Sequence, residues 1–296
     1  MTILVGFSAS RQGNAPLNLA CQISQSANEP VFAAAVVEQD WARPDDPVQN
    51  EYLRYRTTQV ENLLQHAVGK LPGSAASSVT TVVHPSSSIP TGLTELAAQR
   101  DASLVVVGSS SAGLLGRVAL GSVTDRLVHT AALPVAIAPR GYPWQPTPLR
   151  RITASYGGEA DVNGLIKAAA ELAQQWSVSL RIVSFTVRPS SSFGGAVNTA
   201  AENLVVEQWA QRAHEEISRQ LDKARTTIGI PNVEVVVGSG SDWREAVESV
   251  NWTAGDIMAL GSGAAGQAAQ VFLGSAASKI LRHAPVPVLI LPRHQG

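Results

Sequence analysis

The sequence has little cysteine, little charge and no long hydrophobic run. Cys21 is the one cysteine among 296 residues, so no disulfide can form within the chain, as is typical of a reducing compartment. No apolar run approaches the roughly 20 residues that a membrane helix needs. The first residues, MTILVGFSAS, lack the basic and apolar regions of a signal peptide. We therefore expect a cytoplasmic protein.

The low proportion of charged residues also excludes some classes of function. Charged residues make up 15% of the chain and the formal net charge is −1, so general binding to nucleic acid or to a membrane surface is not expected. No HxxxH or CxxC pattern suggests a metal site. No GxxxxGK[ST] is present and no GxGxxG follows the first strand-like run, which argues against a P-loop and against a nicotinamide-binding unit. Hydrophobic residues make up 45%, which indicates a globular chain.

The chain repeats itself at an offset of 153 residues. Residues 121–140, GSVTDRLVHTAALPVAIAPR, align without gaps with residues 274–293, GSAASKILRHAPVPVLILPR. The same offset places Gly108-Ser109 over Gly261-Ser262. Such a long ungapped match indicates a tandem duplication of a unit of ordinary domain length. We predict a first domain at 1–140, a proline-rich linker at 141–150 and a second domain at 151–296.

Each predicted domain alternates strand-like and helix-like patterns. Continuous Val, Ile and Leu runs indicate strands that are buried on both faces, and their alternation with helices indicates a parallel sheet. The predicted fold class is therefore α/β, with two doubly wound units of five mainly parallel strands each. Strands are expected at 3–7, 31–37, 78–84, 104–108 and 135–139, and again at 152–156, 179–186, 233–237, 256–260 and 287–291.

A Ser/Gly-rich loop leaves the fourth strand of the first unit and enters a helix at Gly121-Ser122. Ligands of open α/β sheets bind beyond the carboxyl ends of the strands, and a helix N-terminus attracts anions. Ser122 could cap this helix or donate its hydroxyl to a phosphate. The alternative interpretation is a turn with no ligand. GFSAS at 6–10 differs from a GxSxG nucleophile motif in its last residue, and no partner acid or base accompanies Ser8.

Two α/β units that each end in strand, Gly-rich loop, GS, helix and a "PVxI" strand resemble a tandem universal stress protein. The family pattern is G-x-x-G, nine residues, then G-[S/T]. It falls on Gly108, Ser111, Gly121 and Ser122 in the first unit and on Gly261, Ala264, Gly274 and Ser275 in the second. If the second glycine of the pattern is left-handed, a non-glycine residue there costs roughly 1–2 kcal/mol. Gly113 and Gly263 are candidates to take over the bend.

The resemblance implies a Rossmann-like fold related to the adenine-nucleotide alpha-hydrolases, and binding of ATP in many members but not in others. Where the loop carries no charge, a triphosphate would need Mg²⁺ or distant cations. This sequence departs from the family pattern at two places that would contact the nucleotide. The family aspartate that accepts a hydrogen bond from adenine is replaced by Ser8, and by Tyr156 or Gly157 in the second unit. Val36 suits the base, whereas its counterpart Phe185 could fill the pocket. The predicted contact residues are Ser8, Val36, Gly108, Ser109, Ser111, Arg117, Gly121, Ser122 and Val123, with Gly261, Ser262, Gly274 and Ser275 in the second unit.

The first unit is the better nucleotide candidate because Arg117 lies between its glycines, whereas residues 261–278 carry no charge. We expect a stress regulator that binds ATP through this unit without efficient catalysis. The alternative is an interaction module that binds no nucleotide and acts through protein partners. The resemblance also suggests an intramolecular pseudo-dimer in which the edge strands 135–139 and 287–291 pair. A homodimer of such chains is a further arrangement.

Overall fold

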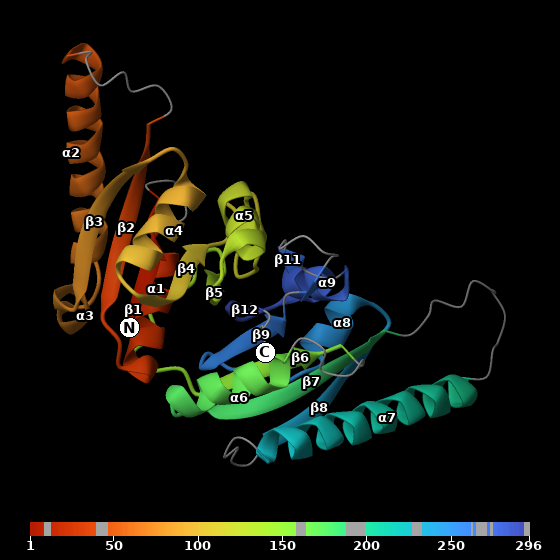
Figure 1. Cartoon of the computed structure of the whole chain (residues 1–296). Helices are drawn as coiled ribbons and strands as arrows, with labels where there is room; N and C mark the ends of the chain where they lie inside the picture. The colour runs from red at the N-terminus through yellow and green to blue at the C-terminus, as the bar shows by residue number, and fades with distance from the viewer. Residues whose placement is uncertain are drawn as a thin grey trace. The chain divides into compact units, whose positions relative to one another are not determined.

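The computed structural model describes residues 1–8, 13–39, 47–157, 164–187, 199–226, 233–261, 263–264, 271–272 and 275–292. The chain forms two compact units, unit 1 at Met1–Leu149 and unit 2 at Arg150–Gly296 (Figure 1). Each unit is described by itself below.

Unit 1 alternates strands and helices as the sequence predicts. Its elements are β1 (Thr2–Gly6), α1 (Ala15–Ala27), β2 (Val31–Glu38), α2 (Pro47–Gly69), α3 (Gly73–Ser77), β3 (Val79–Ser86), α4 (Ile89–Gln99), β4 (Ala102–Gly108), α5 (Ser122–Thr130) and β5 (Val135–Ala138).

The five strands of unit 1 form a parallel sheet in the order β3-β2-β1-β4-β5. Ile3 of β1 lies in register with Val31 of β2 on one side and with Leu104 of β4 on the other. These three side chains are at most 2% exposed, which explains why the strands read as continuous apolar runs. The predicted doubly wound α/β unit is confirmed.

Local sequence signals set the helix ends beside this sheet. Ser88 caps α4 through its Oγ, which accepts a hydrogen bond from the Thr91 N–H at 3.3 Å. Pro90 stands in the first turn, where a missing N–H costs nothing. Helix α1 ends at Asn28, whose φ of 54° is the left-handed conformation of a helix C-terminus.

The proline-rich segment after β5 lies against α1. Three polar side chains, each four residues apart on that helix, donate hydrogen bonds to backbone carbonyls of the proline-rich segment. Asn18 reaches the carbonyl of Tyr142 at 2.9 Å, Gln22 that of Thr147 at 3.2 Å and Ser26 that of Leu149 at 3.5 Å. The Tyr142 hydroxyl in turn donates to Oε1 of Gln22 at 2.6 Å. Residues spaced by four share one helix face, so α1 holds this segment along its length.

Unit 2 repeats the architecture with the order β8-β7-β6-β9-β12, again parallel. Its elements are β6 (Arg151–Tyr156), α6 (Leu165–Gln175), β7 (Ser179–Val187), α7 (Thr199–Arg225), β8 (Val233–Gly240), α8 (Trp243–Glu248), β9 (Asp256–Gly261), β10 (Gly263–Ala264), β11 (Val271–Phe272), α9 (Ser275–His283) and β12 (Val288–Leu291). The antiparallel pair β10 and β11 is an addition that the sequence did not predict.

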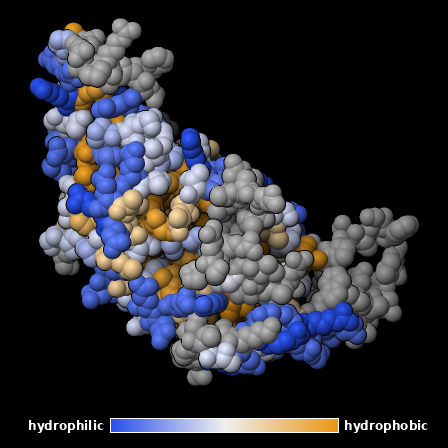
Figure 2. Space-filling view, in the orientation of Figure 1, coloured by the Kyte–Doolittle hydropathy of each residue, from blue (hydrophilic) through white to orange (hydrophobic). Residues whose placement is uncertain are grey.

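Close packing of a helix on the sheet fixes one glycine position in unit 2. A Cβ atom at Gly238 of β8 would come within 2.5 Å of the Ala246 carbonyl oxygen of α8. Asp242 caps α8, since its Oδ1 accepts a hydrogen bond from the Glu245 N–H at 2.8 Å. In Figure 2 the coloured residues of α7 are almost entirely hydrophilic on the face that is shown. Within the described residues, no helix has the length and apolarity to cross a membrane.

Candidate functional site

The strands of unit 1 end around one cavity of about 360 Å³. Gly6, Ser8 and Gly108 bring the carboxyl ends of β1 and β4 into its wall, and Val36 brings that of β2. The sheet order reverses between β1 and β4, and open α/β sheets bind their ligands at such a switch point. The structure thus gathers seven of the predicted residues around the cavity: Ser8, Val36, Gly108, Ser111, Gly121, Ser122 and Val123.

Other wall residues were not predicted from the sequence. Ala34 and Ala35 of β2, Val60 of α2, and Ile89 and Leu93 of α4 form the apolar part of the wall. Periodicity shows that such residues face inward, but it does not distinguish a cavity wall from a packed core. The side of the cavity near β2 is therefore apolar, and the side near α5 is lined by hydroxyl groups.

The loop between β4 and α5 is fastened at its base by Ser109. This side chain is 2% exposed, and its Oγ accepts from the Ala119 N–H at 2.8 Å and donates to the Ala119 carbonyl at 3.2 Å. Ser110 adds a backbone hydrogen bond from its N–H to the same carbonyl at 2.7 Å. Ser109 lies outside the cavity wall, so it organises the loop, whereas a contact with a ligand was predicted for it.

Arg140 fastens the tip of the same loop. Its Nη1 donates to the Gly113 carbonyl at 2.7 Å. Its backbone carbonyl accepts from the Gly116 N–H at 2.9 Å, and its N–H donates to the Arg117 carbonyl at 3.1 Å. The loop therefore keeps a defined shape beside the cavity.

The glycines of this loop act differently from the sequence-based expectation. Ser111 has no positive φ, so it carries no left-handed strain. The left-handed residue is Gly116, with φ 73°, whereas Gly113 was expected to take over the bend. Gly113 is needed for space, because a Cβ there would lie 2.8 Å from the Cβ of Ala119. The loop thus accommodates Ser111 by making its turn five residues later.

Helix α5 begins at the cavity wall. Gly121 is its N-cap, with φ −97° and ψ 171°, and no side chain caps the helix. Ser122 is the first helical residue, so the predicted capping by Ser122 is wrong, and its exposed hydroxyl borders the cavity. Thr124 Oγ1 donates to the Gly108 carbonyl at 3.0 Å and ties the helix to the end of β4. The first N–H groups of a helix have no intrahelical acceptor, which makes this end suited to an anion.

Charge is absent from the cavity wall as far as the described residues define it. Arg117 lies outside the wall, and Arg140 binds the Gly113 carbonyl. Asp125 in the first turn of α5 lies 3.4 Å from Nε2 of His129. An anion in this cavity would be held mainly by backbone N–H groups, hydroxyls and the helix dipole.

The corresponding edge of unit 2 is different. Strand register places Gly157 at the position of Ser8, and Tyr156 is a buried strand residue. Phe185 takes the place of Val36 and its ring packs on Gly238. The loop after Gly261 forms the short β10–β11 ladder, where unit 1 has its fastened loop. Ser275 begins α9, while the predicted Ser262 and Gly274 lie outside the described residues.

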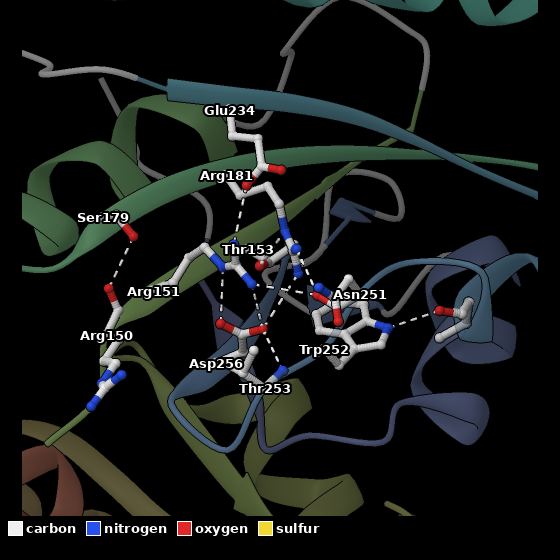
Figure 3. Close-up of polar contacts among 11 residues, drawn as sticks. Arg150, Arg151, Thr153, Ser179, Arg181, Glu234, Asn251, Trp252, Thr253 and Asp256 are labelled. Carbon is white, nitrogen blue, oxygen red and sulfur yellow. Dashed lines mark hydrogen bonds and ion pairs between the residues drawn. The ribbon is translucent and has the colours of Figure 1, made fainter. Parts of the chain in front are cut away.

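A second polar cluster lies at the amino ends of the unit 2 strands, away from the carboxyl edge (Figure 3). Arg151 binds Asp256 with two hydrogen bonds of 2.9 and 2.8 Å and Glu234 with one of 3.1 Å. Nη2 of the buried Arg181 lies 3.5 Å from Asp256, and its guanidinium covers the Trp252 ring at 4.9 Å.

The pKa values of the two arginines of this cluster are shifted in opposite directions. Hydrogen bonding to Asp256 raises the pKa of Arg151. Burial, followed by the neighbouring positive charge of Arg151, lowers the pKa of Arg181. Two positive and two negative groups balance here, so the cluster joins the strands without an added ion.

The family follows from this fold and from direct comparison. The model of the universal stress protein family matches residues 1–139 and again residues 148–292. The chain belongs to the universal stress protein family and carries two tandem copies of its domain.

A relative that matches along the whole chain supports this assignment. Universal stress protein Rv2319c of Mycobacterium tuberculosis is 32% identical over 296 residues, which is 99% of this chain and 100% of the relative. The crystal structure of a universal stress protein from Archaeoglobus fulgidus matches with TM-score 0.62 and 17% identity, over 99% of this chain and 98% of that one. A further universal stress protein of that organism, in complex with dAMP, matches 47% of this chain and 97% of its own, at 14% identity and TM-score 0.33.

Proposed function

We propose that this protein is a cytoplasmic stress regulator that binds an adenine nucleotide, ATP with Mg²⁺, in the cavity of unit 1. One observation carries the proposal. The residues that the family pattern selects converge on a single cavity at the switch point of the sheet, beside the open end of α5. A volume of about 360 Å³ lies in the range of small-molecule sites.

The wall suggests how the nucleotide lies. Ala34, Ala35 and Val36 offer the base an apolar surface. Ser122 and the N–H groups of the first turn of α5 face the phosphates. Because no charged side chain lines the described wall, Mg²⁺ would neutralise part of the triphosphate charge, and ATP binding should weaken when Mg²⁺ is removed.

The same wall disfavours catalysis. Hydrolysis needs a group that positions or deprotonates the attacking water. The wall residues within the described ranges include no carboxylate and no histidine. We propose that any hydrolysis of the bound nucleotide is slow, so that the bound state itself is the signal.

Titration calorimetry with Mg-ATP tests the site. Gly121 has an unstrained φ, and a Cβ there would make ordinary contact with Ser110 at 3.6 Å. Gly121→Val should therefore fold normally while its branches enter the cavity, and binding should fall by roughly tenfold or more. The matched control is Gly157→Val at the equivalent edge of unit 2, where a Cβ meets nothing within 4 Å. Equal loss in both variants, or no heat in the wild type, would reject the proposal.

A specific observation supports the alternative, an interaction module. Leu114 and Leu115 are each 76% exposed at the tip of the fastened loop, and a rigid exposed apolar pair suits a contact with a protein partner. If the wild type binds no nucleotide, capture of partners that is lost on Leu114→Ser with Leu115→Ser would favour this function. Capture that is unchanged by the double substitution would reject it.

A further inference from the structure

The two ends of helix α2 in unit 1 differ in how they pack. Its last third packs on the sheet, where Leu64, Ala67 and Val68 are buried. Val60 lines the cavity. None of the residues from 47 to 59 is buried, and Figure 1 shows the first turns of α2 extending past the carboxyl end of β2. A helical segment with no buried residue is marginal in water, since helix stability comes mostly from tertiary contacts.

The projecting part of α2 carries an apolar stripe on its outer face. Val48 is 75% exposed, Tyr52 59% and Tyr55 62%. The stripe continues with the exposed polar residues Gln59 and Asn62. Successive spacings of four, three, four and three residues are those of the a and d positions of a coiled coil. On a helical wheel this stripe lies opposite the residues that face the sheet.

We propose that this stripe, from Val48 to Asn62, is the docking surface for the same helix of a second copy of the chain, in parallel and in register. Val48, Tyr52 and Tyr55 then form three facing layers between the two helices. Gln59 and Asn62 follow as polar layers, and polar groups at such positions fix the register of a pair.

The charged residues beside the stripe favour a second copy of the chain as the partner, and they favour a parallel orientation of the two helices. Glu51 precedes Tyr52 and takes a g position, and Arg56 follows Tyr55 and takes an e position. In a parallel pair, a g residue faces the e residue five positions later in the partner, so Glu51 meets Arg56 of the second copy twice over. Within one helix Arg56 already covers the Tyr52 ring at 5.9 Å. In an antiparallel pair the g positions face each other, which brings Glu51 opposite Thr58 or Gln65 and forms no ion pair.

The pairing segment spans little more than two heptads, so the association should be weak and should depend on concentration. It does not depend on the proposed nucleotide. The test therefore uses the full-length protein without added ligand, and its outcome is independent of the calorimetry described above.

Cysteine cross-linking tests the direction of the pair. Cys21 is buried, and burial raises the pKa of its thiol to about 11, so an introduced cysteine is the reactive one. Val48→Cys should form a disulfide-linked dimer under mild oxidation. Val48 lies at the start of α2, and two helices paired along their length bring their equal ends together only when they are parallel. Asn50→Cys, two residues on at an f position, is the matched control. Cross-linking of Val48→Cys that does not exceed that of Asn50→Cys would overturn the proposal.

Sedimentation velocity over a concentration series tests the surface and the ion pairs. We expect a reversible dimer that Tyr52→Glu with Tyr55→Glu weakens by roughly tenfold or more. Glu51→Arg and Arg56→Glu should each weaken it, and the two together should restore it. A wild type that stays monomeric, a dimer that tolerates the tyrosine substitutions, or a charge exchange that fails to restore pairing would each overturn the proposal.

Discussion

A single residue, Ser8, stands where the family pattern has an aspartate. Ser8 lies at the cavity wall, so an aspartate there could accept a hydrogen bond from the adenine base. We predict that Ser8→Asp tightens adenine-nucleotide binding by roughly tenfold, the gain from a hydrogen bond to a charged acceptor. Ser8→Ala should change affinity little. Calorimetry with Mg-ATP measures both, and weaker binding of the aspartate variant would mean that the base lies elsewhere.

The buried carboxylate of Asp256 holds two arginines of unit 2. Its removal leaves the buried Arg181 without its counter-charge, so Asp256→Asn should destabilise the chain by about 3 kcal/mol. Glu234→Gln is the matched control, because Glu234 binds the same Arg151 but is 54% exposed. Its cost should be about 1 kcal/mol or less. Urea unfolding compares the two, and equal costs would show that burial is not the deciding factor.

Glu95 gives unit 1 a defined pH dependence. Its Oε2 lies 2.9 Å from Nε2 of His84 and accepts from Ser86 at 3.0 Å, and these bonds lower the pKa of Glu95. A carboxyl whose folded pKa is lowered stabilises the fold above its ordinary pKa, and this stabilisation is lost as the pH falls through the folded value. Glu95→Gln should therefore reduce stability at neutral pH and flatten its decline on acidification. Urea midpoints at several pH values test this, with the exposed Glu61→Gln as control.

At the scale of elements, α1 and the segment after β5 depend on one buried amide. Gln22 is fully buried and bonds to both Thr147 and Tyr142. Gln22→Leu keeps the volume but removes both hydrogen bonds, so we predict a loss of about 2 kcal/mol and faster proteolysis within 141–149. Ser26→Ala on the same helix face removes only a 3.5 Å bond and is the control. Unchanged proteolysis of the leucine variant would show that other contacts hold the segment.

The elements themselves were largely predictable. Buried parallel strands read as apolar runs, and the repeat doubled the evidence for each of them. The packing of 141–149 on α1 was not predictable, because Asn18, Gln22 and Ser26 resemble the polar face of any surface helix. The short β10–β11 ladder gave no signal, since two-residue strands are too short for periodicity to show.

At the scale of the whole chain, a duplication has diverged between its copies. Both units keep the strand order. Both also keep a helix whose first residue is a serine, Ser122 in α5 and Ser275 in α9. Unit 1 keeps Val36 beside a cavity, while unit 2 has Phe185 packed on Gly238. The family spacing selected Gly108, Ser111, Gly121 and Ser122, and all four line the cavity of unit 1. The sequence could not place Arg117 outside the wall or show that Gly116 makes the turn, because both depend on the three-dimensional course of the loop.

The central claim is that the cavity of unit 1 holds an adenine nucleotide. The most direct measurement is to purify the full-length protein, denature it and identify any released nucleotide by chromatography. We predict adenine nucleotide at up to one molecule per chain from the wild type and none from Gly121→Val. A wild type that releases no nucleotide, and gives no heat with Mg-ATP at millimolar concentration, would contradict the account and leave the Gly-Ser loop as a turn without a ligand.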